Sequence, residues 1–407
     1  TTDGAVTIDG PVTLATGAVS VTTANDAITF NHSIDGTQSL TLESGSAAIT
    51  LDGAIGADAI LTGLSVNATD GSTGTIEIAN IGDADAEGVN TGAISIGNAN
   101  TATLTLDGTI YKTDGVTVYE AATGDTILLT GVSPTISTKN DSLTFDGGNI
   151  VLSSAGTTTI DTELGGSGAG NILIDGTIDG TSGQSEALVI TGGSGSVTIQ
   201  GTIGGDNAVT SLTIGGSGTG TIEVVGIGDS NTTGATGAVA IGNTSTGTLT
   251  LDGTIYKADS TQTYTAATGQ NIDITGAATF TTTNDAIAFA TSGVDLANNG
   301  TTTINTGTGV GAVTFGGAIE TNGGSNDILT ITSGGGAVTF TGALGVTNSL
   351  GGLNVNSAAG AGNITFSSTI GDAENAGVAG TTAIGNAATN DLNFNSTIYS
   401  FNGATTI

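Results

Sequence analysis

The 407-residue sequence contains no cysteine, methionine or tryptophan, only two prolines, and aromatic residues at 3% of its length. Without cysteine the chain can form neither a disulfide nor a thiolate metal site, which suits a protein exported in an unfolded state. Two prolines and the lack of a Gly-X-Y period exclude a collagen triple helix. The few aromatic residues mean that a core must be built mainly from Val, Ile, Leu and Ala.

Positive charge is equally scarce. The chain has three basic residues (Lys112, Lys139 and Lys257) against 36 acids, for a formal net charge of −33. Nucleic-acid binding is excluded because it requires Lys and Arg to displace phosphate counterions, and anionic lipid surfaces are disfavoured for the same reason. No run approaches the roughly 20 apolar residues of a membrane-spanning helix, so we expect no membrane insertion. Residue 1 is Thr and no signal peptide is visible. We therefore expect a matured secreted protein or a segment of a longer one.

A long repeat runs through the sequence. Leu104–Lys112 and Leu249–Lys257 both read LTLDGTIYK, and Leu392–Ser400 reads LNFNSTIYS, at offsets of 145 (249 − 104) and 143 (392 − 249) residues. The phrase Ile-Gly-Asp recurs with similar spacing, at Ile81–Asp83, Ile227–Asp229 and Ile370–Asp372. Self-similarity of this kind indicates an array whose neighbouring units bury each other's faces.

A finer repeat lies inside the long one. A phrase with apolar residues at alternate positions, then Gly or Ser, then Ile or Leu, begins at Ile172, Val197, Ile222 and Leu249, in steps of 25, 25 and 27 residues. A second strand and a glycine-rich turn precede many of these phrases, as in ALVITGGSGSVTI at Ala187–Ile199. One cycle is thus strand, turn, strand, glycine kink, short strand and variable loop.

These patterns predict an all-β fold. Every strand alternates apolar and polar residues over three to five positions, and no stretch shows the 3.6-residue period of a helix. Three short strands per cycle of about 25 residues describe a parallel β-helix (β-solenoid), in which each strand pairs with its equivalent one coil along at about 4.8 Å. The general preference of crossover connections predicts a right-handed winding.

The landmarks of the long repeat divide the chain into a shorter unit 1–131, a second unit 132–276 and a third unit 277–407. A single coil cannot bury enough apolar surface to fold alone, and only stacking on its neighbours makes it stable. We therefore expect one continuous rod with three sequence units instead of three independent domains.

The search for catalytic residues gives none. Lys112 and Lys257 occupy the same repeat position, which favours a role in balancing loop charge over a role as a base. Asp107, Asp175 and Asp252 lie at repeated turn positions, where Asp is a local hydrogen-bonding residue. Paired carboxylates of the glycosidase type stay open from sequence alone. We predict that the chain is not an enzyme.

We also predict no cofactor and no specific metal site. His32 is the only histidine, and without cysteine it leaves a zinc site short of ligands. We expect a surface turn at His32 and no Ser-His-Asp triad. Calcium is the one alternative, because Gly165–Asp175 (GGSGAGNILID) loosely resembles a calcium-binding nonapeptide but lacks its key aspartate and its period. Acidic loops such as the one holding Asp83, Asp85 and Glu87 favour loose, non-specific condensation of cations such as Ca²⁺.

Two further sets of residues recur in register. An Asn-Asp pair opens a strand at Asn25, Asn140 and Asn284, and we interpret these asparagines as turn or capping residues and not as ligands. Tyrosines recur at Tyr111, Tyr256 and Tyr399. We expect these rings to pack at a corner of the coil, with stacking on a sugar as the alternative.

The recurring phrases VTIQGTIG, LTLDGTIY and GGSG resemble those of giant bacterial β-strand-repeat surface proteins, which include filamentous-haemagglutinin-like adhesins and autotransporter passenger β-helices. The resemblance covers nearly the whole chain. It implies a right-handed β-helix, export to the cell surface, and work as a stalk, fibre or adhesin.

We expect a structural protein of an extracellular fibre, sheath or stalk, because the loops repeat between units. The alternative is a cell-surface adhesin that binds glycans or host proteins through its loops, and a carbohydrate-active enzyme ranks third. Neither end of the sequence shows a capping helix or a charged, proline-bearing strand, and uncapped strands invite pairing. We expect the rod to continue, within a longer polypeptide or by head-to-tail stacking of copies.

Overall fold

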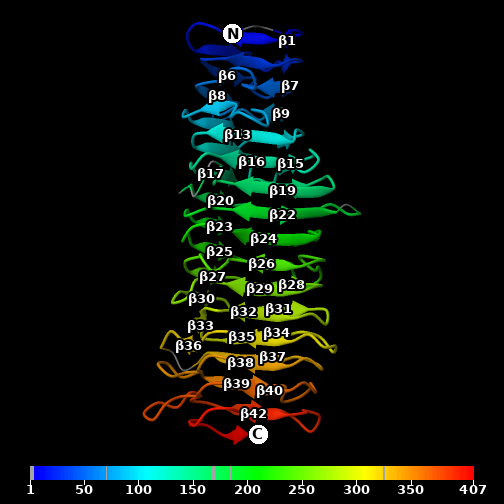
Figure 1. The fold of residues 1–407 in the computed structure, drawn as a ribbon. Coiled ribbons are helices and arrows are strands. Elements are labelled where there is room, and N and C mark those ends of the chain that lie inside the picture. The colour runs from blue at the N-terminus through cyan, green and yellow to red at the C-terminus, as the bar shows by residue number, and fades with distance from the viewer. Residues whose placement is uncertain are drawn as a thin grey trace. The chain divides into compact units, whose positions relative to one another are not determined.

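The structure is a computed structural model that describes residues 4–407 except 70, 165, 167, 169, 184, 324 and 325. All regular elements among these residues are β-strands, and all strand–strand pairings are parallel (Figure 1). By its internal contacts the chain divides into two units. Unit 1 comprises Thr1–Gly201 with Gly216–Gly218, and unit 2 comprises Thr202–Gly215 with Thr219–Ile407.

Unit 1 winds through three sheets in the order A, B, C, one strand of each per coil. Sheet A contains β1 (Val6–Ile8), β4 (Ile28–Phe30), β7 (Ile49–Ile55), β9 (Ile76–Ile81), β12 (Thr103–Leu106), β15 (Thr126–Leu129), β18 (Asn149–Leu152) and β21 (Ile178–Asp179). Sheet B contains β2 (Val12–Leu14), β5 (Ile34–Gly36), the ends of β7 and β9, β13 (Ile110–Asp114) with β10 (Val89–Asn90) beside it, β16 (Thr135–Thr138), β19 (Gly156–Asp161) and β22 (Glu186–Thr191). Sheet C contains β3 (Val19–Thr22), β6 (Ser39–Glu43), β8 (Gly63–Val66), β11 (Ile94–Gly97), β14 (Thr117–Glu120), β17 (Leu143–Asp146), β20 (Ile172–Ile174) and β23 (Val197–Ile199).

Unit 2 winds in the same manner through sheets that we name D, E and F. Sheet D contains β24 (Ser211–Gly215), β26 (Val239–Ile241), β29 (Gln262–Thr265), β32 (Ile287–Ala290), β35 (Val313–Phe315), β38 (Val338–Phe340), β40 (Ile364–Phe366) and β42 (Leu392–Phe394). Sheet E contains β25 (Ile222–Val224), β27 (Leu249–Leu251), β30 (Asn271–Ile274), β33 (Gly293–Leu296) and β36 (Ile319–Thr321), and single bridges continue it through Leu344, Ile370 and Tyr399. Sheet F begins with bridges at Ile203 and Ile227 and contains β28 (Ile255–Ala258), β31 (Thr279–Thr282), β34 (Thr301–Asn305), β37 (Ile328–Thr332), β39 (Gly352–Val355), β41 (Thr382–Ile384) and β43 (Thr405–Thr406).

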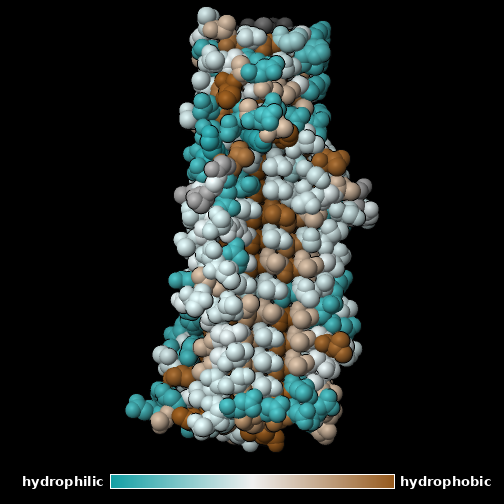
Figure 2. Space-filling model, viewed as in Figure 1, coloured by the Kyte–Doolittle hydropathy of each residue, from teal (hydrophilic) through white to brown (hydrophobic). Residues whose placement is uncertain are grey.

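The interior of each unit is made of ladders of identical or similar apolar residues. Leu104 of β12 lies in register with Ile76 of β9 and with Ile127 of β15, and all three are fully buried. The residue between two inward positions points outward, and Thr fills many of these positions because a β-branched side chain favours the extended backbone. On the face drawn in Figure 2 the surface is consequently mostly white to teal, of intermediate to hydrophilic character.

Unit 2 carries an aromatic column inside sheet D. Six rings from successive coils stack with centroid separations of 5.3, 5.0, 5.4, 4.7 and 5.3 Å and interplanar angles no larger than 19°. The rings belong to Tyr264, Phe289, Phe315, Phe340, Phe366 and Phe394. A chain with few aromatic residues thus concentrates many of them in one ladder, where the register of a parallel sheet holds them face to face.

The fold prediction is confirmed: the protein is all-β, a parallel β-solenoid of about 25 residues per coil with three strands per coil. The described residues form no helix, as the period-two alternation predicted. The right-handed winding, the three sequence units 1–131, 132–276 and 277–407, and the continuous rod stay predictions.

Candidate functional site

The most constant surface feature is a corner loop that starts at each Ile-Gly-Asp phrase. The isoleucines of the three copies are fully buried, and the following glycines, Gly82, Gly228 and Gly371, have φ of 76°, 71° and 69°. A residue with a Cβ rarely adopts this left-handed conformation, so the phrase requires glycine there. The glycine turns the chain out of the sheet and places the aspartate at the base of an outward loop.

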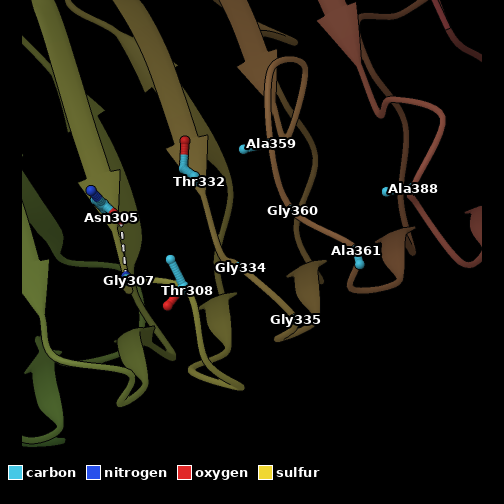
Figure 3. A pocket seen from close by; sticks show the side chains of 10 residues that line it. All are labelled: Asn305, Gly307, Thr308, Thr332, Gly334, Gly335, Ala359, Gly360, Ala361 and Ala388. Carbon is cyan, nitrogen blue, oxygen red and sulfur yellow. Dashed lines mark hydrogen bonds between the residues drawn. The ribbon is translucent and has the colours of Figure 1, made fainter.

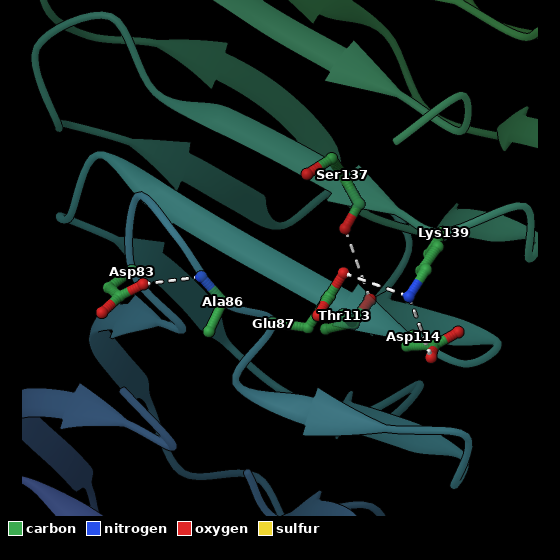
Figure 4. Close-up of polar contacts among 7 residues, drawn as sticks. All are labelled: Asp83, Ala86, Glu87, Thr113, Asp114, Ser137 and Lys139. Atoms are coloured by element: carbon green, nitrogen blue, oxygen red, sulfur yellow. Dashed lines mark hydrogen bonds and ion pairs between the residues drawn. The ribbon is translucent and has the colours of Figure 1, made fainter. Parts of the chain in front are cut away.

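The aspartate closes the loop with its own carboxylate. In the first copy, Asp83 Oδ1 accepts a hydrogen bond from the backbone N–H of Ala86 at 2.7 Å (Figure 4) and another from that of Asp85, also at 2.7 Å. Asp83 N–H donates to the Ala86 carbonyl at 3.0 Å. Asp229 and Asp372 of unit 2 form the same hydrogen bonds within their own loops. These hydrogen bonds stabilise the ionised form and hold the pKa of Asp229 and of Asp372 below the usual range.

The lysines lie against these loops. Lys112, in the coil after the Asp83 loop, donates from Nζ to the Ala84 carbonyl. Lys139 Nζ lies 3.7 Å from Glu87 Oε1 and 3.8 Å from Asp114 Oδ2 (Figure 4). The Lys139 side chain is 44% exposed, so these ion pairs are screened and contribute little to stability. In unit 2, the charge of Lys257 helps to keep the pKa of Asp229 low. The structure thus places Lys112 and Lys257 at the acidic loops, as predicted from their repeat position.

The repeated tyrosines are interior residues. The Tyr111 hydroxyl accepts from Gly108 N–H at 2.7 Å and donates to the Ile78 carbonyl of the previous coil at 2.8 Å. Tyr256 makes the same pair of hydrogen bonds, with Gly253 N–H at 2.9 Å and the Val224 carbonyl at 2.8 Å. Both rings are fully buried, and burial raises the pKa of both hydroxyls. The alternative prediction, that these rings stack on a sugar, is therefore wrong for Tyr111 and Tyr256. The ring of Tyr399 is half-buried, and its hydroxyl accepts from Ser396 N–H.

We expect Tyr111→Phe to destabilise unit 1 by about 1–3 kcal/mol, because it leaves a buried N–H and a buried carbonyl without their partner. The matched control is Tyr119→Phe, since Tyr119 is also fully buried but its hydroxyl has no hydrogen-bond partner. Denaturant unfolding of both variants measures the difference. Equal losses of stability in the two variants would contradict the bridging role of the Tyr111 hydroxyl.

The asparagines of two Ile-Gly-Asn phrases, Ile96–Asn98 and Ile384–Asn386, join one coil to the previous one. Asn98 Nδ2 donates to the carbonyls of Asn67 and Ser72, one coil earlier, at 2.6 and 2.9 Å. In unit 2, Asn386 Nδ2 donates to the carbonyls of Asn356 and Gly360 in the same way. These amides satisfy carbonyls at a bend where strand pairing stops. In the sequence, only the recurrence of Asn after a buried Ile-Gly pair could have signalled this role.

The Asn-Asp pairs are turn residues, as predicted. Asn140 and Asn284 have φ of 68° and 72°, and Asn25 Oδ1 accepts from Ser46 N–H of the next coil at 3.0 Å. His32 lies in an exposed turn, also as predicted. The three aspartates assigned to turns are exposed beside the strands: Asp107, Asp175 and Asp252. In the proposed calcium phrase Gly165–Asp175, positions 165, 167 and 169 lie outside the described residues.

Sheet E of unit 2 carries a row of carboxylates on its outer face. Asp273, Asp295 and Glu320 pair in register on β30, β33 and β36. Glu320 accepts three backbone N–H bonds from Val346, Thr347 and Asn348 at 3.1, 3.1 and 2.9 Å, whereas Asp295 Oδ1 is buried without a hydrogen-bond partner. Burial, and then the charge of Asp273, raise the pKa of Asp295. Burial also raises the pKa of Asp273.

Mild acid should therefore stabilise unit 2. The pKa of Asp273 and of Asp295 is higher in the folded than in the unfolded chain, so between the two values the folded chain binds more protons. The free energy of unfolding therefore rises as the pH falls from neutral through the folded pKa values toward about 4, the unfolded value. We expect a higher unfolding midpoint at pH 5 than at pH 7, and a smaller difference in Asp295→Asn. The control variant is Asp229→Asn. Folding lowers the pKa of the Asp229 carboxyl instead of raising it, so removing this carboxyl should leave the stabilisation by acid in place.

A shallow groove of about 470 Å³ crosses the turns between sheets F and D of unit 2 (Figure 3). Successive coils contribute one wall segment each, and the lining residues are small: Asn305, Gly307, Thr308, Thr332, Gly334, Gly335, Ala359, Gly360, Ala361 and Ala388. No titratable side chain lines it. The groove offers van der Waals contact and backbone hydrogen bonds, but no acid, base or nucleophile stronger than a threonine hydroxyl.

Within the described residues, no group of three or more His, Cys, Asp or Glu side chains is arranged to hold a metal ion. The same residues include no helix long and apolar enough to cross a membrane. Comparison of the chain with protein-family models, with curated proteins and with solved structures found no significant match.

Proposed function

We propose that this chain is a structural repeat protein, without enzymatic activity, that forms part of an extracellular fibre, sheath or stalk at a cell surface. The observation that carries the proposal is the way the repeated residues are used. The repeated Ile, Tyr and Asn join one coil to the next, and the repeated Gly and Asp give the corner loop the same hydrogen bonds in every copy. Only the tips of these loops differ in sequence, from Ala84–Glu87 to Ser230–Thr233 to Ala373–Ala376. The residues that recur in this protein are therefore those that form and stack the coils, which supports a structural role.

The proposed assembly is end-to-end continuation of the solenoid. In the last coil of unit 2 the apolar residues Leu392, Phe394, Tyr399 and Phe401 are only half-buried. Their counterparts one coil earlier are fully buried: Ile364, Phe366, Ile370 and Val378. A further coil would bury this apolar face and pair its strand edges, and either more of the same polypeptide or a second copy of the chain could supply it.

Electron microscopy and sedimentation of the purified chain, over a range of concentration and salt, test head-to-tail stacking. We expect concentration-dependent filaments, strengthened by salt because salt screens the net charge of −33. Leu392→Asp should abolish them. The control is Val310→Asp, which adds the same charge at a lateral position that is 81% exposed and should leave filament formation unchanged. A monodisperse monomer under all conditions would contradict stacking between molecules.

The alternative function, an adhesin that binds glycans or host proteins through its loops, rests on the resemblance to surface β-helices. The structure favours the structural role over glycan binding in one respect. Most aromatic rings, including Tyr119, Tyr264 and Phe289, are fully buried and thus withdrawn from the stacking that sugar recognition commonly uses. Binding of the intact chain to a glycan array would support the adhesin instead.

A further inference from the structure

Within unit 2, two copies of the long repeat lie on different sheets. Leu249 of the second copy lies on β27 of sheet E, whereas its counterpart Leu392 lies on β42 of sheet D. Tyr256 lies on β28 of sheet F, whereas its counterpart Tyr399 bridges to Ile370 in sheet E. Because the chain visits the sheets in the order D, E, F, each residue of the third copy lies one sheet back from its counterpart in the second.

The corner loops follow the same rule. Ile227 bridges to Ile203 and Tyr256 in sheet F, so the Asp229 loop leaves from sheet F. Ile370 bridges to Leu344 and Tyr399, so the Asp372 loop leaves from sheet E. Both loops nevertheless keep the same aspartate hydrogen bonds and the same positive glycine φ. The same loop geometry, built on the Ile-Gly-Asp phrase, thus fits two different corners of the coil.

Unit 1 shows the step independently, with a different landmark. The Asn25–Asp26 pair leads into β4 of sheet A, and its counterpart Asn140–Asp141 leads into β17 of sheet C. Since the order in unit 1 is A, B, C, this is again one sheet back. The threonine two residues before each asparagine, Thr23 or Thr138, donates to the carbonyl of the aspartate at both corners.

The cause is the length of the repeat counted in strands. From Leu249, five coils bring the chain to Ile370 on the same sheet E, and two more strands, β41 and β42, bring it to Leu392. The repeat therefore contains a whole number of strands but not of coils. Such a repeat can persist only where each sheet offers the same inward ladder and each corner the same bend.

We propose that a given strand of the long repeat can lie in any of the three sheets of the coil. Successive copies of the repeat thereby place their corner loop on successive sides of the solenoid. A partner that contacts this loop meets it on more than one side. This part of the inference rests on the proposed structural role, in which copies of the chain join end to end and each further repeat adds its corner loop on the next side.

Two insertions of whole segments test interchangeability. A second copy of residues 250–392 placed after Leu392 moves every inserted strand one sheet back. A second copy of residues 250–370 placed after Ile370 returns every inserted strand to its own sheet. We expect both proteins to unfold cooperatively, with unchanged midpoints, and to resist proteolysis across the insert. A protease-sensitive insert in the first protein alone would overturn the proposal.

If neither insertion variant folds, distances between pairs of spin labels in the chain without an insertion test the proposal. The chain has no cysteine, so pairs of spin labels can be placed on exposed loop residues without background. Ser230 and Ala388 lie at the same corner, between sheets F and D, whereas Ala373 lies between sheets E and F. We expect a longer distance for Ser230→Cys with Ala373→Cys than for Ser230→Cys with Ala388→Cys, although Ala373 is closer in sequence. The reverse order would overturn the one-sheet step. Folded insertions with no self-association would contradict the structural role alone.

Discussion

Phe340→Ala should lower the stability of unit 2 by about 3–5 kcal/mol, the usual cost of deleting a buried phenylalanine ring. Phe340 is fully buried, and its ring stacks between those of Phe315 at 5.4 Å and Phe366 at 4.7 Å. Truncation leaves a cavity between two coils and interrupts the aromatic column. Because each coil of a solenoid is stabilised by its neighbours, we expect the adjacent coils to lose stability as well.

Denaturant unfolding, with limited proteolysis to locate the weakened coils, measures this effect. Thr339→Ala is the matched control, since Thr339 lies on the same strand, points outward, and should change stability by no more than about 0.5 kcal/mol. The loss of stability in Phe340→Leu should lie between those of Phe340→Ala and Thr339→Ala, because leucine fills most of the cavity but does not stack on the neighbouring rings. A Phe340→Ala protein as stable as the Thr339→Ala control would mean that the column does not hold the coils together.

Strand positions and burial were predictable from the sequence because a solenoid strand has one simple pattern. Ile172 and Ile174 are separated by an outward residue and are fully buried, and Val197 and Ile199 pair with them in register, as the alternation and the 25-residue step indicate. Short-range periodicity and a constant step length are enough to specify this part of the fold.

The sheet on which each phrase lies was not predictable from the phrase. LTLDGTIYK and LNFNSTIYS differ in sheet although they match in pattern, because all three sheets accept the same alternation. Assignment to a sheet requires the number of strands in every intervening coil, and that number is obscured where β7 and β9 each serve two sheets.

The candidate site was predictable only in outline. Repetition identified the Ile-Gly-Asp loops and the lysines beside them, because sequence spacing survives in the coil. The polar side chains that join one coil to the next were harder to recognise. Asn98 and Asn386 look like turn residues, and the hydroxyls of Tyr111 and Tyr256 have partners about 30 residues away in sequence. Such contacts become visible only when the coils are stacked.

Gly108→Ala is expected to be the most damaging of the small substitutions in unit 1. A Cβ at Gly108 would lie 1.2 Å from the Ala79 carbonyl oxygen of the previous coil, so the two coils would have to separate at that corner. Overpacking a well-filled interior costs about 1–3 kcal/mol and sometimes more. We expect the upper end or beyond, because the obstacle is backbone and because Gly108 N–H also donates to the Tyr111 hydroxyl.

Two controls separate this close approach from a general effect of losing a glycine. Gly10 has no atom within 4 Å of an added Cβ, so Gly10→Ala should be neutral or stabilising by up to about 1 kcal/mol through the unfolded state. Ser396 occupies the position of Gly108 in the third copy of the repeat, where the chain already accommodates a Cβ, so Ser396→Ala should cost little. Unfolding midpoints of the three variants measure the contrast. If Gly108→Ala and Gly10→Ala behaved alike, the coils would have to be farther apart at the Gly108 corner than the strand register requires, and the repeated glycine of LTLDGTIYK would need another explanation.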